Sequence, residues 1–73
     1  MYAMDTAPKP VLNALQVQLL ELLASGASRW QIARELHYSE AYVKVLLSEL
    51  RRQLGAANSV EAVARAFRTG LLR

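Results

Sequence analysis

The sequence predicts an all-α domain of four helices, over residues 13–25, 28–37, 39–54 and 59–69. Three observations support this fold class. Apolar residues recur at intervals of three and four, which is the period of an amphipathic helix. Each of these segments begins at, or directly after, a serine or asparagine that can cap a helix. No segment alternates apolar and polar residues as a half-buried strand does.

The composition agrees with one small domain. Of 73 residues, 53% are hydrophobic and none is cysteine, so the core must form without disulfides or thiolate metal sites. No apolar run reaches the roughly 20 residues that cross a bilayer, and no secretory signal opens the chain. We therefore expect a cytoplasmic protein with no membrane partner. Residues 1–11 are expected to be a flexible tail or linker remnant, because Pro8 and Pro10 bar a helix, and residues 12–73 the domain.

The first two predicted helices have matching start signals. Asn13 and Ser28 can cap them, and Gln16 and Gln31 follow at the capping-box position. Gly26 is expected to end the first helix. The apolar residues at helical spacing, and therefore expected in the core, are Leu15, Leu19, Leu22 and Leu23 in the first helix and Ile32, Ala33 and Leu36 in the second.

The third predicted helix begins at Ser39 and ends at Gly55. Its core stripe follows spacings of four, three and four, through Val43, Leu47, Leu50 and Leu54. The fourth begins near Asn58, with Glu61 in the position of another capping box. This fourth helix is apolar around most of its circumference, which indicates burial on more than one side. In so small a domain, we expect another chain to provide the second covering surface.

The second and third helices are joined by a very short connection, around His37 to Ser39. Such a join is typical of a helix-turn-helix, in which one helix braces the next against the major groove of DNA. A lone His with no Cys does not suggest a metal site, so His37 is interpreted as a turn residue. No nucleophile–base pair or cluster of carboxylates appears, so we expect neither an enzyme nor a bound cofactor. The net charge of +3 suits an anionic partner, although it could serve only solubility.

Four pieces of the sequence, "IARELHYSE", "VK", "LG" and "EAVARA", carry a family resemblance. In these pieces the chain resembles, without gaps, the LuxR/GerE-type helix-turn-helix domain of bacterial transcription regulators. The resemblance covers residues 12–72. It implies that the third helix lies in the major groove of double-stranded DNA, and that a homodimer forms through the fourth helix and binds inverted-repeat half-sites. In this family a receiver or sensor domain usually precedes the domain, though stand-alone members exist, so the resemblance leaves open a stand-alone regulator or a piece of a longer one.

The third helix departs from the family pattern at three positions. Tyr42, Leu46 and Ser48 stand where the family has Thr, His and frequently Asn or Lys. Leu46 is expected either to widen the core or to add to an exposed apolar patch that would suit a protein partner. Tyr42 could bind a phosphate or cover the edge of the core. The alternative function is thus a degenerate helix-turn-helix that binds a protein through the apolar surface of its third helix.

Most candidate DNA contacts lie on the third helix. Lys44 can reach a guanine edge or a phosphate, and Val45 can pack on a thymine methyl or simply face solvent. Of Arg51 and Arg52, one is expected to follow the phosphates and the other to pair with a glutamate, Glu49 or Glu35. The full set of candidates is Arg29, Ser39, Glu40, Ala41, Tyr42, Lys44, Val45, Ser48, Arg51 and Arg52, with Ser39 foremost a helix cap and Glu40 foremost a partner of the helix dipole.

Two further expectations concern large apolar side chains. Trp30 could bind the DNA backbone beside Arg29, but we expect it to close the small core. Val60, Ala64 and Phe67 lie on a different face of the fourth helix from the residues that hold it to its own domain. We expect that face to join two copies of the chain; the alternative is an intramolecular core contact.

Overall fold

The computed structural model describes residues 12–72, which form four α-helices. These are α1 (Ala14–Ala24), α2 (Arg29–Leu36), α3 (Glu40–Leu54) and α4 (Ser59–Arg68). The predicted all-α fold is confirmed, and each helix lies close to its predicted bounds. The tail expected over residues 1–11 lies outside the described residues, as does Arg73. None of the helices in the described range is long and apolar enough to span a bilayer.

The helix starts follow the predicted caps, with one difference. Capping boxes form between Asn13 and Gln16 and between Ser28 and Gln31. At α4, Asn58 accepts a hydrogen bond from the backbone of Glu61, but the Glu61 carboxylate does not return to Asn58. It accepts instead from the N–H of Ala57, one residue earlier. The predicted capping box of the fourth helix is therefore only half formed.

All four helices end in the same backbone motif. The residues that close them, Gly26, His37, Gly55 and Gly70, have φ values of 90°, 61°, 66° and 82°. The next N–H in each case reaches back to a carbonyl in the last turn, as when Tyr38 donates to Ala33 at 2.9 Å. This is the Schellman arrangement, which favours glycine at its left-handed position. Among residues 12–72, only His37 adopts a positive φ without being glycine, which confirms its role in the turn.

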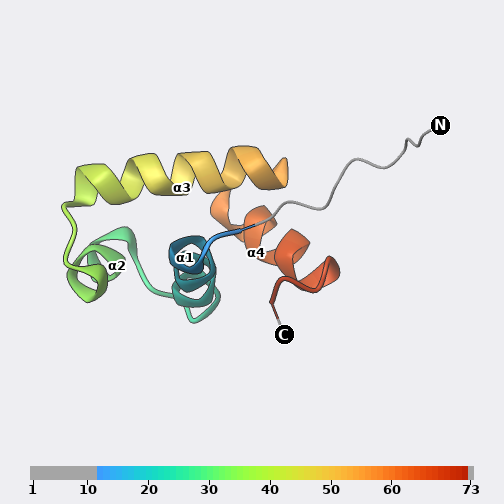
Figure 1. Cartoon of the computed structure of the whole chain (residues 1–73), viewed down its shortest axis with the longest axis horizontal. Helices are drawn as coiled ribbons and strands as arrows, with labels where there is room; N and C mark the ends of the chain where they lie inside the picture. The colour runs from blue at the N-terminus through green and yellow to red at the C-terminus, as the bar shows by residue number, and fades with distance from the viewer. Residues whose placement is uncertain (1–11, 73) are drawn as a thin grey trace.

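The core lies where α3 passes over the other three helices. Figure 1 shows α3 along one side of the domain, with α2, α1 and α4 in a row beneath it. α1 packs against both α3 and α4, so two adjacent faces of α1 are covered. Leu19 and Leu20 are both fully buried for this reason, whereas Leu15, which the spacing placed in the core, is only partly buried. The buried core consists of Leu19, Leu20, Ile32, Ala33, Val43, Leu47, Leu50, Leu54, Ala62, Ala66 and Leu72.

Candidate nucleic-acid interface

The turn between α2 and α3 sets the direction of the third helix. His37 reverses the chain in its left-handed conformation, and the Ser39 hydroxyl accepts a hydrogen bond from Tyr42 N–H at 3.1 Å. The predicted capping role of Ser39 is thereby confirmed. The stripe of Val43, Leu47, Leu50 and Leu54 is buried as predicted, so the opposite face of α3 is turned to solvent.

This outward face of α3 carries one exposed ridge. Ala41, Lys44, Val45 and Ser48 all lie on it, and Val45 is 56% exposed. Lys44, Val45, Ser48, Glu49 and Arg52 line a shallow hollow along the ridge. Among residues 12–72, Lys44 takes part in no ion pair. The ridge therefore offers a free cation, an apolar group and a hydroxyl on one helix face, a combination that can contact phosphates and base edges.

The starts of α2 and α3 meet beside this ridge. Arg29 Nε lies 3.9 Å from Glu40 Oε1, and both side chains are about half exposed, at 50% and 51%. An ion pair this open to solvent contributes little to stability, so Arg29 remains able to exchange its partner for a phosphate. Glu40, for its part, sits in the first turn of α3, where a carboxylate also complements the helix dipole.

One of the two arginines, Arg52, pairs with a glutamate as expected, and that the other follows phosphates stays a prediction. Arg52 Nη2 lies 3.3 Å from Glu49 Oε2, so this arginine pairs with Glu49 rather than Glu35. Arg51 donates to the Ser48 hydroxyl at 3.3 Å and is partly buried. This bond ties Arg51 to the ridge, because Ser48 lies on it.

Two side-chain pairs were not anticipated from the sequence: one of two aromatic rings, and one of an aromatic ring with a cation. The ring of Tyr42 packs edge-on against that of Tyr38, with centroids 4.9 Å apart. Tyr42 is nevertheless 46% exposed. Trp30 is 51% exposed, and the Arg34 guanidinium lies 4.9 Å from its ring centroid. The expectation that Trp30 closes the core is wrong, because half of its side chain is exposed. The face of α2 that packs on the core is formed by Ile32, Ala33 and Leu36.

The structure also decides the position of Leu46. Its side chain is partly buried and packs against the core cluster, so it widens the core instead of extending an outer patch. Of the three consecutive apolar residues Val45, Leu46 and Leu47, only Val45 is therefore exposed.

Helix α4 has two distinct faces, as predicted. Ala62 and Ala66 are fully buried against the domain, whereas Val60 is 81% exposed and Phe67 48% exposed. Ala64 is exposed on the same side. Phe67 is thus about half buried and lines a hollow with Ala24 and Leu71, while Val60 and Ala64 are exposed. That a second copy covers them stays a prediction.

Metal-ligating side chains do not gather at this interface. Within the described range, no three His, Asp or Glu residues are placed so that they could hold a metal ion. The His37 backbone makes the turn, and its side chain is exposed.

Comparison with known proteins places these features in a family. The sequence pattern described as "Bacterial regulatory proteins, luxR family" matches residues 10–66. The transcriptional activator protein VanR of Vibrio anguillarum is 38% identical over 71 residues, which cover 97% of this chain and 30% of VanR. The HTH-type quorum sensing-dependent transcriptional regulator RpaR of Rhodopseudomonas palustris is 39% identical over 70 residues, covering 90% of this chain and 29% of RpaR.

A solved structure shows the same arrangement of helices. The response regulator ChrA of a heme-sensing two-component system superposes with a TM-score of 0.83 and 32% identity, over 93% of this chain and 34% of the ChrA chain. The chain thus spans about a third of the length of the relatives it matches. With its four helices, its short turn and the match over residues 10–66, the chain belongs to the luxR family of bacterial regulatory proteins.

Proposed function

We propose that this chain is a sequence-specific DNA-binding domain of a transcription regulator, with α3 as the helix that enters the major groove. The observation that carries the proposal is the exposed ridge of α3, where Lys44, Val45 and Ser48 project from a helix whose opposite face is fully buried. A helix braced in this way by the preceding one is the geometry that docks in the groove. The relatives VanR and RpaR are named as transcriptional regulators, which supports the same function here.

The contacts divide between base edges and phosphates. Lys44, Val45 and Ser48, with Ala41 and Glu40 at the start of the helix, form the part of α3 that would face the bases. Arg29, Tyr42, Arg51 and Arg52, with the backbone N–H groups that follow Ser39, would contact phosphates on either side. Because two of these five base-facing residues, Ala41 and Val45, are apolar, the isolated domain is expected to bind with modest selectivity.

A homodimer through α4 completes the proposal. The exposed Val60, Ala64 and Phe67 form an apolar face on the helix, and a second copy related by a two-fold axis would cover it with the same residues. Two copies arranged in this way would bind inverted-repeat half-sites. In the intact protein, a receiver or sensor domain is proposed to control this association.

The alternative of a protein-binding module depended on an apolar surface on the third helix. The packing of Leu46 against the core leaves Val45 as the exposed apolar residue in the middle of α3. A single exposed valine is ordinary on a protein surface, so DNA binding remains the better-supported function.

The experiment is a selection of random-sequence duplexes by the purified chain at two salt concentrations, followed by sequencing. We expect an enriched inverted repeat and a steep loss of affinity with salt. Lys44→Ala should reduce the log–log salt slope by about 0.9 if it removes a phosphate contact, or relax one base position if it removes a base contact. Arg34→Gln, which removes an exposed cation on α2, is the charge-matched control and should keep the enriched motif. If no duplex is retained even at low salt, α3 does not dock on DNA.

A further inference from the structure

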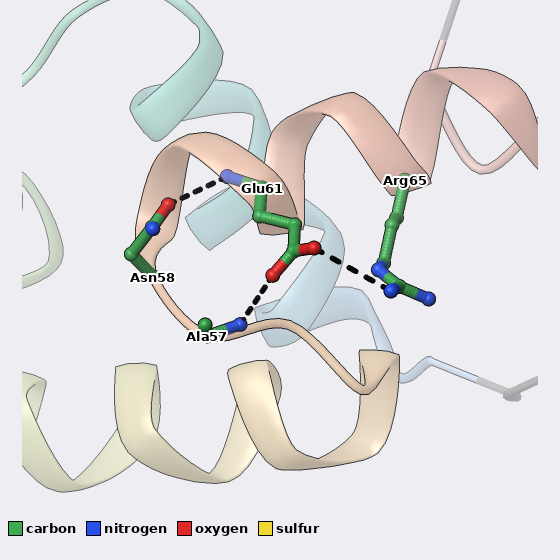
Figure 2. Close-up of polar contacts among 4 residues, drawn as sticks. All are labelled: Ala57, Asn58, Glu61 and Arg65. Atoms are coloured by element: carbon green, nitrogen blue, oxygen red, sulfur yellow. Dashed lines mark hydrogen bonds and ion pairs between the residues drawn. The ribbon is translucent and has the colours of Figure 1, made fainter.

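One carboxylate, that of Glu61, makes two contacts at the link between α3 and α4. Glu61, in the first turn of α4, accepts a hydrogen bond from Ala57 N–H at 2.6 Å through Oε1. Its other oxygen, Oε2, lies 3.5 Å from Arg65 Nη2. Figure 2 shows the carboxylate between the backbone of the connection and the Arg65 side chain, one turn further along the helix. Both oxygens are therefore engaged, one with the loop and one with α4 itself.

The rest of the connection is tied to one helix or the other. The N–H groups of Gly55 and Ala56 donate to carbonyls in the last turn of α3, those of Arg52 and Arg51. The next residue, Ala57, is the first whose N–H turns to α4, through Glu61. Arg65 lies near Gly55, the residue that ends α3, since a Cβ added to Gly55 would lie 3.8 Å from Arg65 Nη1. The Glu61–Arg65 pair thus links the backbone of the connection to the first two turns of α4.

The apolar contact that α4 makes with the core is centred on small side chains. The residues that α4 buries most deeply in the core are Ala62 and Ala66, both 0% exposed. Alanines allow a close approach, but a single methyl group interlocks little with its neighbours compared with a larger side chain. Val63 also packs against the core, and α1 packs against α4. Glu61 adds to these apolar contacts a polar one at the start of the helix.

We infer that Glu61 is a positioning residue that holds α4 at a fixed angle to α3 and thereby sets the half-site spacing that the dimer accepts. The inference rests on the proposed function, in which α3 binds DNA and α4 joins two copies. In such a dimer, any tilt of α4 moves the two α3 helices apart or together. One extra base pair shifts a half-site by about 3.4 Å along the duplex and rotates it around the axis, so a rigid joint discriminates between spacings.

The first measurement reports the angle without DNA. The chain has no cysteine, so spin labels can be placed uniquely at Ala41→Cys and Arg68→Cys, two exposed positions near the far ends of α3 and α4. Dilution with unlabelled chain removes distances between copies. We expect a narrow distance distribution in the otherwise unchanged chain. Glu61→Ala should broaden it, and Glu61→Gln, which keeps an oxygen for Ala57 N–H, should remain close to the parent.

The second measurement compares the affinities for inverted repeats whose spacing changes by single base pairs, with a lone half-site alongside. Glu61→Ala should reduce the discrimination between the best and the next spacing by roughly fivefold or more, a typical coupling between two sites. Its affinity for the lone half-site should be unchanged. Glu35→Ala, which removes an exposed carboxylate on α2, is the matched control. Helical content by circular dichroism confirms that each variant is folded. If Glu61→Ala is not folded, the comparison passes to Arg65→Gln, which removes the cation that pairs with Glu61.

The outcomes separate the inference from the function on which it rests. A parent chain that binds no duplex refutes the proposed function and, with it, the role of Glu61 in half-site spacing. The spin-label distances still test whether Glu61 fixes the angle between α3 and α4. A folded Glu61→Ala variant with an unchanged distance distribution overturns the inference that Glu61 fixes the angle between the two helices. A broadened distribution with unchanged spacing discrimination overturns the spacing role alone.

Discussion

His37 offers the sharpest test of the helix-turn-helix backbone. It occupies the left-handed position that closes α2, with φ 61° and ψ 40°, where the other three helices have glycine. Its side chain is exposed, so the residue acts mainly through its backbone. Replacing it by glycine should relieve the strain of the Cβ and leave the hydrogen bonds to Ala33 and Arg34 in place.

The size of the effect follows from two opposing contributions. A residue with a Cβ loses about 1–2 kcal/mol in the left-handed region, and His, which tolerates it better than most, lies at the lower end. Glycine loses about 0.5–1 kcal/mol through its more flexible unfolded chain. The net gain for His37→Gly is therefore at most about 0.5 kcal/mol, which for a domain of this size would raise the Tm by no more than roughly 2–4 °C.

Urea and thermal unfolding of three variants test this reasoning. His37→Ala keeps the Cβ and should lie within about 0.5 kcal/mol of the parent, so the difference between the glycine and alanine variants isolates the backbone. Gly55→Ala is the reverse experiment at the end of α3. Its new Cβ would meet Arg65 at an ordinary 3.8 Å, so strain alone should destabilise it by about 1 kcal/mol. A glycine variant no more stable than the alanine variant would refute the strain at His37.

Three other predictions concern the core, acid stability and the dimer face. Leu50→Ala, at a fully buried position, should lower the free energy of unfolding by about 3 kcal/mol, whereas Val45→Ala on the exposed side should change it by less than about 0.5 kcal/mol; urea titration compares them. The Ala57 N–H bond, aided by Arg65 and opposed by burial, lowers the pKa of Glu61. Its contribution to stability is therefore present above the carboxyl pKa of the unfolded chain and is lost as pH falls through the folded pKa. Unfolding of Glu61→Gln across acidic pH should lack that loss. Phe67→Glu should weaken binding to an inverted repeat but not to one half-site, with sedimentation showing fewer dimers.

The helices and their ends could be predicted from the sequence because their signals are local. Asn13, Ser28 and Ser39 cap with their own side chains, and the next polar residue needed, Gln16 or Gln31, is three positions away. The stripe of α3 was predicted in full, since one face of that helix covers the rest of the domain. That one of Arg51 and Arg52 pairs with a glutamate was predicted, but which arginine and which glutamate was left open; the structure pairs Arg52 with Glu49, one turn away.

The misplaced residues are those whose surroundings come from distant parts of the chain. Leu20 is buried and Leu15 only partly buried because α1 is covered on two sides, by α3 and by α4. Trp30 is exposed because smaller residues of α2 already fill its contact with the core, and the Arg34 side chain stacks on the ring. The Glu61 carboxylate binds Ala57 rather than Asn58 because the path of the connection brings that N–H closer.

The sequence by itself determined the helices, their caps and the family, because each depends on residues within a turn or two of one another. Only the tertiary structure decided the surroundings of residues whose burial the spacing left open or misplaced, such as Leu46 and Trp30. The physical reason is that burial depends on what packs from outside the segment. Leu46 and Phe67 are both apolar residues on amphipathic helices, yet α3 turns one toward the core and α4 leaves the other exposed.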